Sequence, residues 1–245
     1  MSATEWLQAD WPAPAKVRTL ITTRQGGVSP APYHSFNLGA HVGDNPEHVA
    51  SNRETLRQYL PDEPAWLNQI HGTTVVDAAE LDGTLVDADG SFSRQPGIVS
   101  VVMTADCLPV LFTNDAGTVV ASAHAGWRGL CDGILEATIA ATGEPAINLM
   151  AWLGPAIGPD AFEVGAEVRA AFMAHDPAAD AAFTAIGDDK YLADIYQLAR
   201  QRLAENDVTR VYGGDFCTVI DRARFFSYRR DRVTGRMASL IWLEP

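Results

Sequence analysis

The chain has 245 residues, of which 47% are hydrophobic and 20% are charged, as is usual for a globular protein with a packed core. Its 31 Asp and Glu against 18 Lys and Arg give a formal net charge of -13, so neither nucleic acid nor an anionic membrane surface is an expected partner. We find no apolar run of the roughly 20 residues that span a membrane and no signal-peptide pattern at the start. The three cysteines, Cys107, Cys131 and Cys217, are too few for a disulfide framework, which favours a cytoplasmic protein.

Predicted strands and helices follow one another irregularly along the chain. The segments rich in β-branched and apolar residues predict strands at 17–22, 98–103, 109–113, 118–123, 147–153, 210–212 and 238–242. Helices are predicted at 46–60, 127–141, 164–174 and 191–204; the first has Asp44 or Asn45 as its cap and Pro46 in its first turn. No linker or repeat marks a boundary, so we expect one α/β domain over residues 1–245 with mixed sheets.

A hairpin is predicted in the middle of the chain. The turn-forming residues 114–117 lie between two apolar strands, and pairing around them would place positions summing to about 231 opposite one another. In that register Cys107 faces His124 at the open end of the hairpin.

Three side chains predict a metal centre. His71, Cys107 and His124 lie in the segments NQIHGTT, TADCLPVLF and SAHAGWRGL. A thiolate with two imidazoles suits zinc, and three protein ligands leave one coordination position for water or substrate. We therefore predict that these three residues are both metal ligands and catalytic residues, and that copper is the alternative metal in the same site.

The remaining histidines and cysteines have structural interpretations. Free cysteines are most often buried, so Cys131 and Cys217 are expected in the interior. We expect His34, His48 and His175 to be hydrogen-bonded structural residues. His41 differs, because its polar, Gly-containing loop HSFNLGAHVGDN suits the wall of a cleft.

Five ordered motifs, NQIHGTTVV, TADCLPVLF, SAHAGWRGL, LGPAIGPDAFEVG and FFSYRRDRVTGR, together resemble the YfiH-type family, also called the laccase-domain or multicopper polyphenol oxidoreductase family. The resemblance implies a four-layer α/β/β/α fold shared with certain toxin deamidases, and it places the family's metal ligands on His71, Cys107 and His124. Members are described as zinc-dependent purine nucleoside phosphorylases that cleave adenosine, inosine or methylthioadenosine with phosphate and also deaminate adenosine. The implied partners are therefore purine nucleosides and phosphate.

Deamination and phosphorolysis need different groups beside the metal. Bound zinc lowers the pKa of water from about 15.7 to about 7, which suffices for attack on adenine, whereas phosphorolysis also needs an oriented phosphate. Arginine binds oxyanions with its planar fork, so Arg24, Arg53 and Arg128 are candidate phosphate ligands, although each could instead form a surface salt bridge. The other predicted substrate contacts are Asn37 and Gln69, and Asp106 is expected to orient a metal ligand.

Three other functions stay open at this level. Cys107 and His124 could form the nucleophile and base of a hydrolase or amidase, which fits the peptidoglycan-precursor editing role also attached to the family. A copper-dependent polyphenol oxidase is disfavoured, because a multicopper centre needs many histidines and the chain has six. A non-enzymatic purine-binding module is the third alternative. A monomer is the default expectation for assembly.

Overall fold

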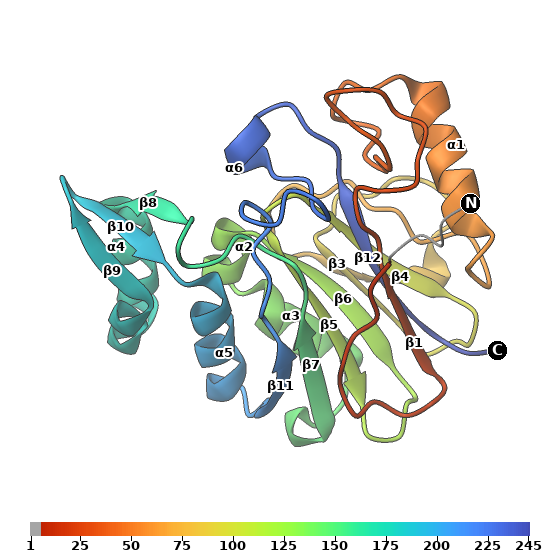
Figure 1. Cartoon of the computed structure of the whole chain (residues 1–245). Helices are drawn as coiled ribbons and strands as arrows, with labels where there is room; N and C mark the ends of the chain where they lie inside the picture. The colour runs from red at the N-terminus through yellow and green to blue at the C-terminus, as the bar shows by residue number, and fades with distance from the viewer. Residues whose placement is uncertain (1–5) are drawn as a thin grey trace.

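Two β-sheets form the centre of the computed structural model, which describes residues 6–245 (Figure 1). The larger sheet has six strands in the order β11-β7-β5-β6-β3-β2, and the smaller has three in the order β1-β12-β4. The β11/β7 and β2/β3 pairs are parallel and the other pairs in these sheets are antiparallel, so the predicted mixed sheet is confirmed. The strands are β1 (Val17–Ile21), β2 (Val75–Asp77), β3 (Gly90–Ser93), β4 (Val99–Thr104), β5 (Leu108–Asn114), β6 (Val120–Ala125), β7 (Leu149–Leu153), β11 (Arg210–Gly213) and β12 (Met237–Leu243).

The alternating directions of the side chains along β12 show how the layers pack. Successive side chains of a strand point to opposite faces. Ile241 packs with Leu111 of β5 between the two sheets, whereas Leu240 and Trp242 join a cluster with Leu56 of helix α1 (Pro46–Arg57) on the outer face. Helices α3 (Ile134–Thr142) and α5 (Ile195–Glu205) cover the far face of the six-stranded sheet. The result is the predicted four-layer α/β/β/α arrangement (Figure 1).

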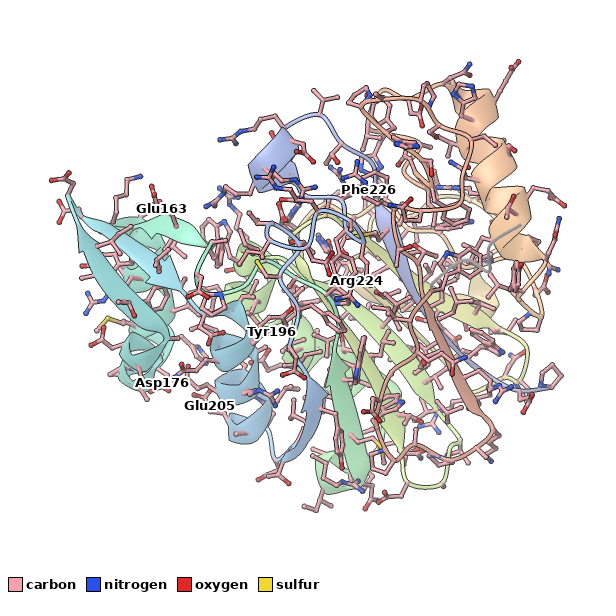
Figure 2. All side chains as sticks on the ribbon, viewed as in Figure 1. Glu163, Asp176, Tyr196, Glu205, Arg224 and Phe226 are labelled. Carbon is pink, nitrogen blue, oxygen red and sulfur yellow. The ribbon has the colours of Figure 1, made fainter. Side chains whose placement is uncertain are left out.

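A third sheet, of order β8-β10-β9, projects from one side of this body and carries helix α4 (Ala166–His175) (Figure 1). Its strands are β8 (Glu163–Gly165), β9 (Phe183–Gly187) and β10 (Lys190–Ala193), and Glu163 marks its position in Figure 2. The sequence did not predict these strands, because they are short and mostly solvent-exposed, so they lack the apolar alternation of core strands. Across residues 6–245, no helix is long and apolar enough to cross a membrane.

All four predicted helices differ in their bounds, and the one predicted at 46–60 ends at Arg57. Residues 127–141 form two helices, α2 (Trp127–Asp132) and α3, because Gly133 between them has a φ of 104°, which breaks the helical path. The helix predicted at 191–204 begins only at Ile195, where Asp194 caps it by accepting a hydrogen bond from the Gln197 N–H at 3.0 Å. The helix predicted at 164–174 begins at Ala166, since the preceding residues belong to β8.

The predicted hairpin exists, but its register was wrong by two residues. Pro109, not Cys107, pairs with His124. The connection is longer than predicted, because Asn114 at the end of β5 accepts hydrogen bonds from the Gly117 and Thr118 N–H groups and thereby holds residues 115–119 as a loop. Cys107 directly precedes β5, which still leaves it beside the end of β6 that carries His124.

Candidate metal centre

His71, Cys107 and His124 converge as predicted, and we call them the His–Cys–His cluster. One ligand atom from each lies within 4.8 Å of the others, and Cys107 Sγ is 3.7 Å from His71 Nε2. Zinc–nitrogen bonds of about 2.0–2.1 Å and a zinc–sulfur bond of about 2.3 Å in tetrahedral geometry require ligand atoms about 3.3–3.6 Å apart. The Cys107–His71 distance is close to this range, whereas a separation of up to 4.8 Å would have to shorten around an ion. The cluster is therefore a metal-binding group whose donor chemistry fits zinc with one position left open.

Asp89 holds two of the three ligands. Its Oδ1 lies 2.8 Å from His124 Nδ1 and accepts a hydrogen bond from the His71 N–H at 2.9 Å. Its Oδ2 accepts from the N–H groups of Ile70 and Gly72, and the whole residue is buried. Because Nδ1 of His124 is engaged with the carboxylate, Nε2 is the nitrogen that can bind a metal. This residue was not predicted, since nothing in the segment DADGSFS marks Asp89 among its neighbours.

The charges of the cluster are coupled. Burial by itself raises the pKa of Cys107, but the adjacent His124 and His71 lower it to about 6. Burial opposes protonation of His124, yet the Cys107 thiolate and Asp89 raise its pKa to about 9. Without metal, these opposite shifts in pKa favour the thiolate form of Cys107 and the imidazolium form of His124. The thiolate is the form of cysteine that binds metals and attacks electrophiles.

Close packing around the cluster explains one glycine in the motif SAHAGWRGL. A Cβ on Gly126 would lie 2.8 Å from His71 Cδ2 and 3.0 Å from Cys107 Sγ, closer than side chains tolerate. Gly126 is also the residue before α2, so the chain can begin this helix directly against the ligands only without a side chain there.

Two cavities meet at the cluster. The first, of about 360 Å³, we call the polar cavity; its lining includes His41, Gln69, Thr104, His124 and Arg236. The second, of about 250 Å³, we call the aromatic cavity; its lining includes Trp127, Arg128, Ile157, Phe162, Ile195 and Arg229. Both are lined by His71, Ala105, Cys107 and Tyr228. The metal-binding group is thus accessible from two sides.

Of the predicted substrate contacts, three lie outside both cavities. The Arg24 guanidinium donates to the His34 carbonyl and stacks over Phe226, which is labelled in Figure 2. Arg53 donates twice to the Leu38 carbonyl. Asn37 is fully buried, and its amide bonds to Gly39, Asp44 and the Arg236 N–H. These three side chains hold the backbone rather than face the cavities.

Gln69 and Arg128 do line the cavities, in different ways. Gln69 Nε2 donates to the Met103 carbonyl at 2.8 Å, and its Oε1 accepts from the Met103 N–H at 2.7 Å, so the amide is already engaged. Arg128 is exposed and lies over the ring of Trp127 at 4.4 Å. Within residues 6–245 no hydrogen bond or ion pair occupies its guanidinium, which leaves it available for a ligand.

Asp106 does not orient a metal ligand, contrary to the prediction. Its carboxylate accepts hydrogen bonds from the Thr218 hydroxyl at 2.5 Å and the Arg229 N–H at 2.6 Å. Asp106 therefore anchors the C-terminal segment that carries α6 (Tyr228–Asp231), while Asp89 takes the predicted role.

That C-terminal segment supplies site residues that the sequence did not identify. Tyr228, Arg229 and Arg236 line the cavities, and all three belong to the motif FFSYRRDRVTGR. The motif was visible, but nothing in it distinguishes cavity-facing residues from Arg230, which instead donates to the carbonyls of Thr218 and Phe225.

A protein-family model and several known proteins match nearly the whole chain. Residues 18–244 match a family model described as multi-copper polyphenol oxidoreductase laccase. The chain is 59% identical over 235 residues to purine nucleoside phosphorylase YfiH of Escherichia coli (strain K12), covering 95% of this chain and 96% of that protein. It is 55% identical over 240 residues to purine nucleoside phosphorylase PA4543 of Pseudomonas aeruginosa, covering 98% of both.

Solved structures of similar proteins also match the fold over nearly the whole chain. The crystal structure of Neisseria meningitidis protein NMB0706 has a TM-score of 0.96 and 59% identity, and covers 98% of this chain and 99% of that one. The structure of YlmD from Geobacillus stearothermophilus has a TM-score of 0.90 at 28% identity, and covers 100% and 98%. Since the family model and these relatives extend over nearly the whole sequence, the chain belongs to the YfiH-type family described as multi-copper polyphenol oxidoreductase laccase.

Proposed function

We propose that this protein is a zinc-dependent purine nucleoside phosphorylase that cleaves adenosine, inosine and methylthioadenosine, acting as a single catalytic domain over residues 1–245. One observation carries the proposal: the His–Cys–His cluster is accessible from two cavities, in a chain 55% to 59% identical to proteins named purine nucleoside phosphorylase. In phosphorolysis the nucleophile and the leaving group lie on opposite sides of the reacting carbon, and two cavities that meet at the cluster can hold two substrates in that orientation.

In phosphorolysis a phosphate oxygen bonds to C1′ of the ribose while the bond from C1′ to N9 of the purine breaks. The electron pair of that bond goes to the purine, and the proton of hydrogenphosphate ends on it. When bound, zinc supplies a Lewis-acidic position and lowers the pKa of water from about 15.7 to about 7. The chain contributes a preorganised site, since Asp89 fixes the ring of His124 and the backbone of His71 before substrate arrives.

Adenosine deamination is the proposed second activity of the same centre. A metal held by His71, Cys107 and His124 would activate the water for this reaction, in which water replaces the amino group at C6 of adenine and ammonia is released. The support is chemical: three protein ligands leave one coordination position free, as in catalytic zinc sites.

The test combines metal analysis with product analysis. Protein purified without added copper should hold about one zinc per chain, as expected for one three-ligand centre, and should release adenine or hypoxanthine from adenosine or inosine only when phosphate is present. Inosine formed from adenosine without phosphate would support deamination. Retention of the wild-type rate by a zinc-free His71→Ala variant would contradict the zinc mechanism.

The same samples separate the alternative functions. A hydrolase that uses only Cys107 and His124 does not need His71 as a ligand, so its activity on an amide substrate would survive in His71→Ala. Phenol oxidation that occurs only after copper is added would mark copper binding to the same ligands rather than the activity of the zinc protein.

A further inference from the structure

We propose that the two cavities divide the substrates between them: the aromatic cavity binds the purine base, and the polar cavity binds phosphate. The assignment rests on the proposed phosphorylase function and adds the location of each substrate. The ribose would then lie across the shared wall formed by His71, Ala105, Cys107 and Tyr228.

The aromatic cavity has the chemistry of a base-binding slot. Trp127, Ile157, Phe162 and Ile195 supply large apolar surfaces, and aromatic rings stack on nucleobases with about 1–3 kcal/mol per base. Its volume of about 250 Å³ is below the range of about 300–1,000 Å³ that is typical of sites for whole small molecules, so it suits a fragment such as a base.

Two guanidinium groups are placed to recognise the base. The Cζ atom of Arg128 lies 4.4 Å from the ring centroid of Trp127, and that of Arg229 lies 5.7 Å from the ring centroid of Phe162. Each guanidinium is therefore held against one of the rings that line the aromatic cavity. Arginine donates readily to N7 of purines, an acceptor that all of them share. A donor at N7 also stabilises the negative charge that develops on the base as the bond to C1′ breaks. Pyrimidines have no N7, so this contact favours purine nucleosides.

The polar cavity has the opposite character. Its lining contains His41, His124 and Arg236 and no Asp or Glu, although the chain as a whole carries a net charge of -13. The aromatic cavity, in contrast, includes Asp106 as well as Arg128 and Arg229. In the polar cavity no acidic side chain stands beside Arg236 to repel an anion.

Arg236 is the residue that we assign to phosphate. Its Nη1 donates to the carbonyls of Thr234 and Gly235, which fixes the guanidinium. Among the residues that the structure describes, its Nε and Nη2 have no hydrogen-bond partner, so two donors remain for an oxyanion. A guanidinium held in place with free donors is the arrangement that binds phosphate in a planar, bidentate manner.

The experiment measures both Michaelis constants in zinc-loaded protein. Phe162→Leu and Trp127→Leu should raise KM for inosine about tenfold, the loss expected for one weakened stacking contact, and leave KM for phosphate within about twofold. Arg236→Met and Arg236→Lys should raise KM for phosphate and leave KM for inosine within about twofold. Phe183→Leu and Arg169→Met, both in the projecting third sheet or its helix α4, are the matched controls and should change neither constant.

Binding measurements keep this test separate from the proposed function. Calorimetry with hypoxanthine alone and with inorganic phosphate alone should show that the Trp127 and Phe162 variants lose affinity for the base, and the Arg236 variants for phosphate, at unchanged zinc content. The opposite pattern, or wild-type protein that binds neither ligand, would overturn the assignment. Wild-type protein that binds both ligands but does not turn over would refute the phosphorylase and preserve the two binding sites.

Discussion

Oδ1 of Asp89 lies 2.8 Å from Nδ1 of His124, and the same oxygen accepts a hydrogen bond from the backbone of His71. One buried atom thus positions two metal ligands that are far apart in sequence. The arrangement links the loop that carries His71 to strand β6, which carries His124.

Replacing Asp89 with Asn should weaken zinc binding by about 10–100-fold, because the carboxylate that orients the imidazole is lost. The amide group would also face the N–H groups of Ile70 and Gly72, and leaving buried donors unpaired costs about 1–3 kcal/mol of folding free energy. Competition with a chelator measures the first effect, and denaturant unfolding of the metal-free protein measures the second. Unchanged zinc affinity would show that Asp89 is not needed to position the ligands.

The metal-free protein should expose a reactive thiolate. Burial raises the pKa of Cys107, but His124 and His71 lower it to about 6, so the thiolate forms as the pH rises through that value. Alkylation by iodoacetamide, followed by peptide mass spectrometry, should therefore reach half its maximal rate near pH 6 at Cys107.

Cys131 supplies the internal control for that titration. Burial raises its pKa, with Asp132 adding to the effect, so it should react only in more alkaline solution. In His124→Gln the midpoint at Cys107 should move upward, since the main charge that stabilises the thiolate is gone. Bound zinc should protect Cys107 at every pH. Equal titration of the two cysteines would contradict this account.

Gly126→Ala should reduce zinc content strongly while the protein remains folded. The added Cβ would lie 2.8 Å from His71 Cδ2 and 3.0 Å from Cys107 Sγ, so at least one ligand must move. Gly165→Ala is a suitable control, because Gly165 also precedes a helix and the three atoms nearest to its Cβ would all belong to the flexible Glu167 side chain. Metal analysis of the two proteins should differ; full zinc occupancy in Gly126→Ala would show that the ligands can adjust.

Gln69→Leu should destabilise the fold rather than abolish substrate recognition. Both ends of the Gln69 amide bond to the backbone of Met103, and the change leaves those groups without partners, at a cost of about 1–3 kcal/mol. Thermal unfolding and zinc analysis should report lower stability with zinc retained. A higher KM for nucleoside at unchanged stability would instead place Gln69 in contact with substrate.

The sequence by itself determined the elements with a strong local signal. Apolar runs predicted the core strands, Pro46 and its preceding cap predicted the start of α1, and soft ligand types in Gly-rich segments predicted the His–Cys–His cluster. These predictions succeed because periodicity, capping and donor chemistry depend on residues close to one another along the chain. The break between α2 and α3 at Gly133 is also a local effect of one residue, although it was not predicted.

Only the tertiary structure decided which polar residues face the ligands. Asp89 and Asp106 are both acids near predicted ligands, yet the first orients His124 and the second anchors the Arg229 backbone. Arg53 and Arg236 are both half-buried arginines, and only Arg236 lines a cavity at the cluster. The physical reason is that the partner of a buried polar group is set by contacts between segments far apart in the sequence, 123 residues apart for Asp106 and Arg229, which local sequence does not encode.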